Sequence, residues 1–182
     1  MVQKKYVYAF GDENTEGTAE MKNLLGGKGA NLGEMASLGI QVPPGFTIST
    51  EACIYYFQNK NTFPSKLWDE ILTRLKYLEK VLGKKFGDAS NPLLVSVRSG
   101  ARVSMPGMMD TVLNLGLNDI TVRGLAKSTK NEWFALDSYR RFISMFGNVV
   151  LGISGERFEA ILKKKKLKRK IEFDTEFTIQ EL

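Results

Sequence analysis

The sequence predicts an α/β (α+β) protein in which a mixed sheet flanked by helices is followed by a small helical subdomain. Residues 1–116 alternate short strand-like runs with helical periodicity, whereas residues 117–182 show helical periodicity only. The composition is that of a globular protein, since 43% of the 182 residues are hydrophobic and 25% are charged. We therefore expect two subdomains, 1–116 and 117–182, with a boundary near residues 116–119.

Two strands and three helices are expected in the first 83 residues, and one of these helices is a short helix that Thr50 can cap and that runs through Ala52 and residues 55–57. VYAFG (7–11) and the end of QVPPGFTIST (41–50) are typical of short strands. Residues 64–83 repeat leucine or isoleucine every three or four positions, with Gly83 where the helix should end. Residues 26–39 also have helical spacing. Their expected apolar face consists of Leu32, Met35, Ala36 and Leu38.

The segment NPLLVSVRSG (91–100) is expected to be a buried strand with Val95 and Val97 on one face and Leu94, Ser96 and Arg98 on the other. From residue 119 onward only helices are expected, in ITVRGLAKS, EWFALDSYRRFISMFG and ERFEAILKKKK. The final TIQE (178–181) fits a capping box that should open a further helix just where the chain stops. We therefore expect a piece of a longer protein.

The residue counts exclude several kinds of chemistry. The chain has no histidine, which excludes Ser-His-Asp and Cys-His hydrolases and the common zinc sites. The single cysteine, Cys53, excludes a disulfide framework and a cysteine-based metal site, and we expect it to be a small buried residue. Catalysis would depend on Lys, Arg, Asp, Glu and backbone amides, a set suited to positioning phosphates.

The positive charge of the chain is local. The net charge is +6, and the basic run KKKKLKRK (163–170) carries seven positive charges, so that +6 minus 7 leaves −1 for all other residues. Such a run without aromatic residues is typical of a solvated helix end, and a basic binding module for nucleic acid or an acidic partner stays an alternative. Because the sequence has neither a long apolar run nor a secretory signal, we expect a soluble, cytoplasmic protein without membrane contact.

Two glycine-rich stretches are candidates for phosphate binding. The first is Gly26-Gly27-Lys28-Gly29 at the expected start of a helix, where backbone N–H groups and the helix dipole favour an anion and Lys28 adds a charge. The spacing matches neither a Walker A loop nor the G-x-G-x-x-G motif. A tight turn with a surface lysine therefore stays open as the alternative.

The second stretch is SVRSGARVSMPGMMDT (96–111), which follows the expected strand. Arg98 at the end of that strand offers a planar fork of donors to phosphate oxygens, and Arg102 is a possible second contact. Gly100 and Gly107 would let the backbone approach a ligand closely. The alternative is that Arg98 pairs with a structural carboxylate and that the methionines of this stretch fill a core.

Residues 24–53, 95–116 and 131–153 together closely resemble the N-terminus of the pyruvate phosphate dikinase family. Phosphoenolpyruvate synthases are similar as far as Val-Arg-Ser but continue with an acidic loop, and such a water-dependent dikinase is the second enzyme hypothesis. The resemblance implies part of an ATP-grasp nucleotide-binding domain that binds Mg-ATP. In the family, the β-phosphoryl group passes to a histidine on a swinging central domain, and a C-terminal barrel then makes phosphoenolpyruvate from pyruvate, with AMP and diphosphate as the other products.

The resemblance also implies what this chain would lack. The phosphorylated histidine cannot be here, and the second ATP-grasp lobe with most magnesium ligands should lie outside the chain. The chain would then supply about half of the ATP site and be inactive alone. Its expected partners are ATP, that second lobe and the phosphohistidine domain. We expect the full-length protein to be a homodimer and this piece to be a monomer.

The resemblance makes Lys28 and Arg98 the expected triphosphate contacts, and Ser104 to Thr111 a loop that covers the phosphates, with Gly107 at its turn. Asp110 is expected to fix the loop, and residues 101–110 to be among the most mobile in the chain. No catalytic residue or metal ligand is expected within the chain itself. The complete set of expected ATP-binding residues is Lys28, Arg98, Gly26, Gly27, Gly29, Ser99, Gly100, Arg102, Ser104, Met105, Pro106, Gly107, Met108, Met109, Asp110 and Thr111.

Overall fold

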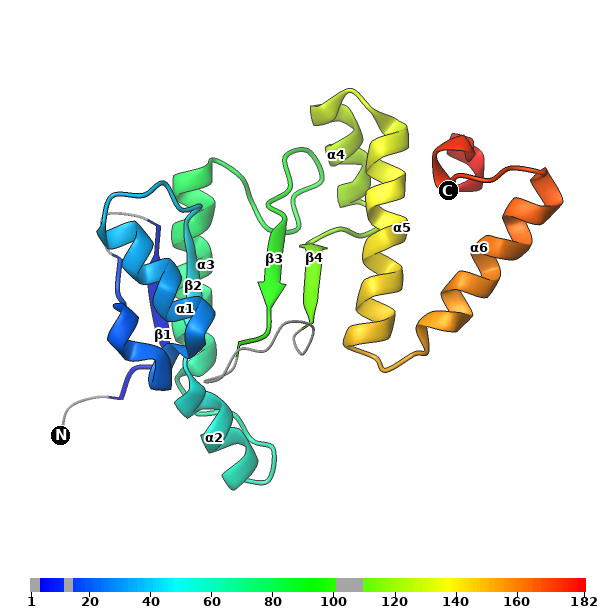
Figure 1. Cartoon of the computed structure of the whole chain (residues 1–182). Coiled ribbons are helices and arrows are strands. Elements are labelled where there is room, and N and C mark those ends of the chain that lie inside the picture. Colours follow the sequence, from blue (N-terminus) through cyan, green and yellow to red (C-terminus); the bar gives the residue numbers. More distant parts are fainter. Residues whose placement is uncertain (1–3, 12–14, 101–109) are drawn as a thin grey trace. The chain divides into compact units, whose positions relative to one another are not determined.

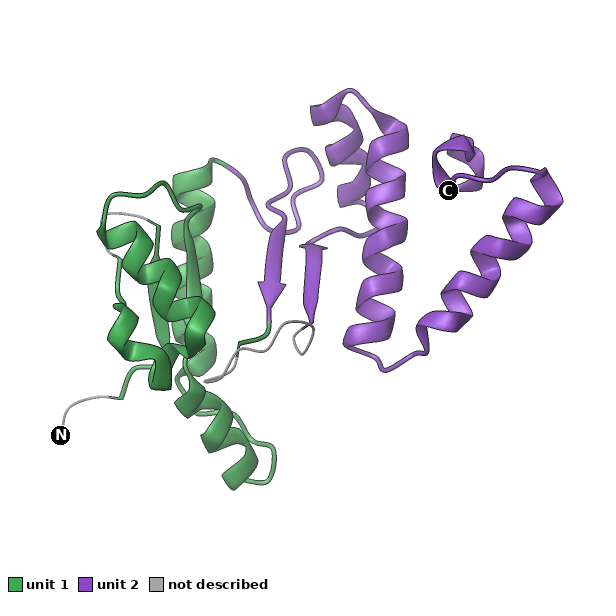
Figure 2. Cartoon of the chain, in the orientation of Figure 1, with its two compact units in different colours: residues 1–83, 99–109 green, residues 84–98, 110–182 purple. Residues whose placement is uncertain are grey.

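The computed structural model describes residues 4–11, 15–100 and 110–182. The chain forms two compact units, shown in Figure 2: unit 1 contains residues 1–83 and 99–109, and unit 2 contains residues 84–98 and 110–182. The two units do not meet at the boundary that was expected near residues 116–119. The strand before residues 99–109 pairs with the strand after them, and both strands belong to unit 2. A domain boundary near 116–119 stays a prediction.

Unit 1 contains a two-stranded antiparallel sheet and three helices (Figure 1). The strands β1 (Val7–Phe10) and β2 (Gly45–Ile48) pair antiparallel, and a 3₁₀ turn, η1 (Ala19–Met21), leads into α1 (Lys22–Ser37). The other helices are α2 (Thr50–Gln58) and α3 (Leu67–Leu82). The expected strands and helices of this region are confirmed. The core of unit 1 consists of Tyr6, Val7, Ala52 and Leu67, with Phe46 and Ile71 packed against it.

The buried face of α1 consists mainly of small residues, which corrects the expected apolar face. Met35 and Leu38, which were expected to be buried, are 39% and 69% exposed. A Cβ atom on Gly29 would lie only 2.7 Å from the side chain of Thr47 on β2, so the helix backbone packs directly against the strand. The periodicity of large apolar residues cannot reveal such a face. Its buried residues are Leu25, Gly26, Gly29, Ala30 and Gly33.

The single cysteine is also placed differently than expected. Cys53 is exposed on α2, because the residue that α2 buries is the neighbouring Ala52. The end of α3 is as predicted, since Gly83 has a φ of 61° and its N–H donates to the carbonyl of Glu79. No helix in the described part of the chain is long and apolar enough to cross a membrane.

Unit 2 pairs β3 (Val95–Arg98) with β4 (Thr111–Leu115) antiparallel, with an irregularity between Val95 and Val97. Within the described ranges, both sheets have two antiparallel strands, which corrects the expected mixed sheet, while the α+β content with six α-helices is as predicted. Val97 is 47% exposed, so β3 is not the buried strand that its sequence indicated.

Three helices follow β4, as predicted: α4 (Thr121–Thr129), α5 (Glu132–Val149) and α6 (Gly155–Arg169). The core of this unit forms where α4 and α5 pack on the chain after β4, and its buried residues are Leu117, Val122 and Ala135. Two 3₁₀ turns, η2 (Asp174–Glu176) and η3 (Ile179–Glu181), complete the element order. The predicted capping box is confirmed at η3, where Thr178 and Glu181 bond to each other.

Residues 171–182 form a C-terminal segment that lies between α5 and the end of α6 (Figure 1). α6 itself buries no residue, so little apolar packing holds it in place. The indole Nε1 of Trp133 on α5 donates a hydrogen bond of 2.6 Å to the carbonyl oxygen of Phe177, whose side chain is 3% exposed. A hydrogen bond therefore joins the segment to α5, and the segment buries one large apolar side chain.

Cations of the basic run also bind the C-terminal segment. The carboxylate of Asp174 lies 2.6 Å from the Nζ of Lys166 on α6 and 2.9 Å from the Nη2 of Arg140 on α5. The Nε of Arg169 lies 2.5 Å from the carboxylate of Glu181. The basic run thus serves partly as a docking partner for the chain's own acidic residues, a role that neither expectation for it included.

Acidification is expected to release the C-terminal segment. The hydrogen bond from Lys166, opposed by partial burial and supported by the charge of Arg140, holds the pKa of Asp174 below its ordinary value of 3.8. A carboxyl group whose pKa is lowered on folding stabilises the folded state above its unfolded pKa, and this contribution is lost as the pH falls through the folded value. The NMR signal of the Trp133 indole N–H should therefore shift only in strongly acidic buffer.

Asp174→Asn is the matched test of this pH dependence. In this variant the Trp133 signal should already have its acid-state position at neutral pH, because the charge that Lys166 and Arg140 bind is gone. Glu159→Gln on the exposed side of α6 serves as the control and should behave like the unmodified chain. A Trp133 signal that follows pH in the same way with and without Asp174 would contradict the prediction.

Candidate functional site

The GGKG stretch lies where α1 is interrupted. Gly26 has φ 69° and ψ 167°, a left-handed conformation that glycine adopts without strain and that breaks the helix into two segments. A helical segment therefore begins again at Gly27, and the predicted helix start at this stretch is confirmed. The first N–H groups of a helical segment point along its axis without acceptors one turn earlier, so residues 27 to 29 offer donors to an anion.

A hydrogen bond links the two glycine-rich stretches. The Nζ of Lys28 donates to the carbonyl oxygen of Ser99 over 3.1 Å, and both residues belong to unit 1. These residues lie 71 positions apart in the sequence. Lys28 is half-buried rather than fully solvated, which goes against the alternative of a tight turn with a free surface lysine. The fold therefore brings Lys28, Ser99 and the restarted helix together, as a phosphate site requires.

Arg98 is the last residue of β3 and lies opposite Thr111 on β4. Both were expected to contact ATP, and the pairing brings them together, with Asp110 next to Thr111 in sequence. Arg98 is exposed, and among the described residues its guanidinium has no ion-pair partner. The alternative role of Arg98, in which it neutralises a structural carboxylate, therefore finds no support in the part of the chain that the structure describes.

Gly100 has open space around it. A Cβ atom there would meet no atom of the described residues within 4 Å, so none of these residues requires glycine at this position. Some expected site residues lie outside the described residues, as does most of the segment 101–110 for which mobility was expected. These residues are Arg102, Ser104, Met105, Pro106, Gly107, Met108 and Met109.

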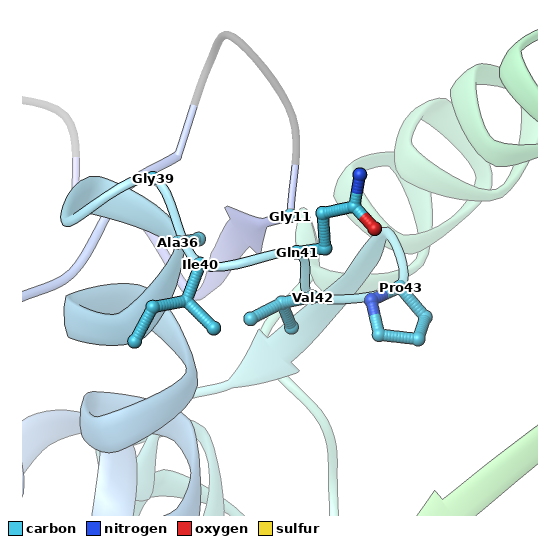
Figure 3. Close-up of a pocket in the computed structure, with 7 residues that line it drawn as sticks. All are labelled: Gly11, Ala36, Gly39, Ile40, Gln41, Val42 and Pro43. Carbon is cyan, nitrogen blue, oxygen red and sulfur yellow. The ribbon is translucent and has the colours of Figure 1, made fainter.

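A separate depression of about 580 Å³ lies on unit 1 at the C-terminal end of α1 (Figure 3). In Figure 3, Gln41 points to the opposite side of its segment from Ile40 and Val42, as in extended chain. The described residues of its lining include no charged side chain and no residue of the GGKG stretch, so none of them offers a cation to a phosphate. Its lining residues are Gly11, Ala36, Gly39, Ile40, Gln41, Val42 and Pro43.

Sequence reasoning missed one contact near the site. The hydroxyl Oγ1 of Thr50, at the start of α2, donates to the carbonyl oxygen of Asn23 over 2.7 Å, in the turn of α1 just before the break. A threonine that follows a serine at a helix start is usually read as a cap, and here neither residue caps α2 through its side chain. Only the three-dimensional packing of α1 and α2 reveals this bond.

The comparisons with known proteins first define the class of domain. Residues 22–76, which contain the broken helix α1, β2, α2 and most of α3, match the model of the family described as "Pyruvate phosphate dikinase, AMP/ATP-binding domain". The GGKG stretch and Thr50 lie inside this match. Within the described residues, no group of three or more His, Cys, Asp or Glu side chains is placed to hold a metal ion.

Individual relatives cover nearly the whole chain. It is 57% identical over 98% of its length to the chloroplastic pyruvate, phosphate dikinase of Flaveria pringlei, and 52% identical over 98% to the pyruvate, phosphate dikinase of Clostridium symbiosum. It is also 53% identical over its full length to the chloroplastic pyruvate, phosphate dikinase 1 of Arabidopsis thaliana. The chain spans 19% to 20% of the length of these relatives. The chain is thus similar over nearly its whole length to one part of these dikinases, and the predicted resemblance is confirmed.

Proposed function

We propose that this chain is the part of a pyruvate phosphate dikinase that receives the phosphates of ATP. The observation that carries the proposal is the bond between Lys28 and Ser99, because it joins both glycine-rich stretches at the start of a helical segment. The match of residues 22–76 to an AMP/ATP-binding domain supports it independently of the geometry. The dikinase names of the relatives favour this enzyme over a water-dependent synthase.

Each residue has a distinct task in this proposal. The backbone N–H groups of residues 27 to 29 fix phosphate oxygens at the helix start, and Lys28 adds a point charge that moves from the Ser99 carbonyl to the nucleotide. Arg98 binds two phosphate oxygens at once through its planar guanidinium. Phosphoryl transfer depends mainly on positioning and charge stabilisation, which these groups supply without a proton-transferring residue.

Magnesium fits this proposal as an ion that arrives with ATP. The resemblance implies that the protein ligands of Mg²⁺ lie mainly in the ATP-grasp lobe outside this chain, and we adopt that placement here. When bound, the ion would neutralise phosphate charge. The residues of this chain would then hold the remaining oxygens and keep the triphosphate in one orientation.

The complete reaction would need further parts of the polypeptide. ATP, pyruvate and phosphate would be converted to AMP, phosphoenolpyruvate and diphosphate through a phosphohistidine, and this chain has no histidine to carry it. We therefore propose that the 182 residues are inactive alone. As the resemblance implies, we further propose that they act with the second lobe and the central domain of a cytoplasmic homodimer. The names of the plant relatives state a chloroplast location for those proteins.

Lys28→Met is expected to weaken the binding of Mg-ATP roughly ten- to one hundred-fold in the full-length protein, because a hydrogen bond to a charged group contributes about 1.5–3 kcal/mol. Arg98→Ala should have an effect of similar size. Isothermal titration calorimetry measures both. Lys22→Met, which removes an exposed lysine from the first turn of the same helix, is the matched control and should leave the affinity unchanged. Equal affinities for all these variants would refute the site.

A further inference from the structure

The break in α1 at Gly26 determines where the N–H groups of residues 27 to 29 point. In an uninterrupted helix, the carbonyl of Asn23 would accept from the N–H of Gly27 one turn later. The φ of 69° and ψ of 167° at Gly26 take the N–H of Gly27 out of that geometry. Whatever stabilises this break therefore also orients the phosphate-binding amides.

Thr50 contacts the helix at this point. Its Oγ1 donates to the Asn23 carbonyl over 2.7 Å, so the first residue of α2 bonds the turn immediately before the break. Helices bend sharply where a side chain competes for a backbone group of the hydrogen-bond ladder, and the Thr50 hydroxyl bonds such a carbonyl just before the break. On the other side of the break, Gly29 packs against Thr47, three residues before Thr50. Both segments of α1 thus rest on the single stretch from β2 to α2.

We infer that Thr50 is a positioning residue for the phosphates of ATP, which acts through Asn23 and Gly26 without touching the nucleotide. The inference rests on the proposed function. The Thr50 bond favours the broken over the straight form of α1, and the broken form aims the amides of residues 27 to 29 at one point. Without the hydroxyl, the helix samples straighter forms in which those amides bond within the helix and are lost to the ligand.

The test compares Thr50→Val with Thr50→Ser in the full-length protein. Valine has the shape of threonine but no donor, whereas serine keeps the donor. We expect Thr50→Val to weaken Mg-ATP binding roughly three- to ten-fold, as the loss of one neutral hydrogen bond would, and Thr50→Ser to restore it. Binding of adenosine, which has no phosphates, should not change in either variant. Calorimetric titrations with both ligands provide these values.

Two outcomes would overturn the inference. Thr50→Val could bind Mg-ATP as tightly as the unmodified protein, or it could lose affinity for ATP and adenosine equally, which would indicate a general packing role. Measuring Mg-ATP binding by Lys28→Met as well shows whether the role of Thr50 or the proposed function is wrong. If Lys28→Met weakens ATP binding and Thr50→Val does not, the phosphate site stands without Thr50. If the unmodified protein does not bind Mg-ATP, the proposed function itself is wrong.

Discussion

Asp137→Ala is expected to destabilise the folded protein by about 3 kcal/mol, the lower end of the cost of removing one partner from a buried ion pair. Asp137 lies on α5 and is 8% exposed. Its two carboxylate oxygens are used separately: one lies 2.5 Å from the Nη2 of Arg140 and the other 2.7 Å from the Nε of Arg141. Alanine would leave Arg140, whose side chain is 15% exposed, with Asp174 alone.

The two arginines should not contribute equally. The Arg141 side chain is 58% exposed, so its pair with Asp137 is screened by solvent and contributes little. Arg140 also connects α5 to the C-terminal segment through Asp174, so its loss breaks two contacts. We therefore expect Arg141→Ala to cost less than about 1 kcal/mol and Arg140→Ala considerably more.

Urea unfolding at neutral pH measures these changes. The matched control is Glu159→Ala, which removes an exposed acidic residue from α6 and should change the free energy of unfolding by less than about 0.5 kcal/mol. A double-mutant cycle of Asp137→Ala and Arg140→Ala should show a coupling energy well above that of Asp137→Ala and Arg141→Ala. Equal couplings would mean that burial does not determine the strength of these pairs.

Local chemistry explains the features that the sequence predicted well. The helix start at GGKG follows from Gly26, because its left-handed φ suits glycine. The end of α3 follows from Gly83 in the same way, and the bonds between Thr178 and Glu181 follow from their spacing. Each of these signals involves only residues within one or two turns of each other.

The features that the sequence did not predict depend on distant residues. The acidic C-terminal segment binds the basic run and Arg140, yet composition shows only that both charges exist and not that they meet. The bond between Lys28 and Ser99 spans 71 positions, so the spacing of residues alone could not place the two halves of the site together, and only the family resemblance did so. The contact between Thr50 and Asn23 gave no signal at all, because any threonine near a helix start looks like a cap.

Gly33→Val is expected to destabilise the protein by about 3 kcal/mol, because α1 packs through its glycines. Gly33 is buried, and a Cβ atom there would lie 2.8 Å from the carbonyl oxygen of Gly17 and 3.0 Å from its Cα. The neighbouring Glu16 holds Gly17 in place, since its N–H bonds the carbonyl of Ala9 over 2.7 Å and its carboxylate lies 2.8 Å from Arg74. The atoms that a larger side chain would meet are backbone atoms, and the adjoining Glu16 is bonded to β1 and to α3, so the helix itself must shift.

A shift of α1 would also move Lys28, so the variant should lose affinity for Mg-ATP as well as stability. Asn31→Val on the exposed side of α1 is the matched control, because it places the same β-branched side chain in the same helix without a neighbour to clash with. Its cost should stay near the helix-propensity difference, below about 1 kcal/mol. Thermal unfolding and ATP titration of both variants measure the two effects. If Asn31→Val and Gly33→Val lower the free energy of unfolding equally, the close approach of α1 to Gly17 does not limit the size of the side chain at position 33.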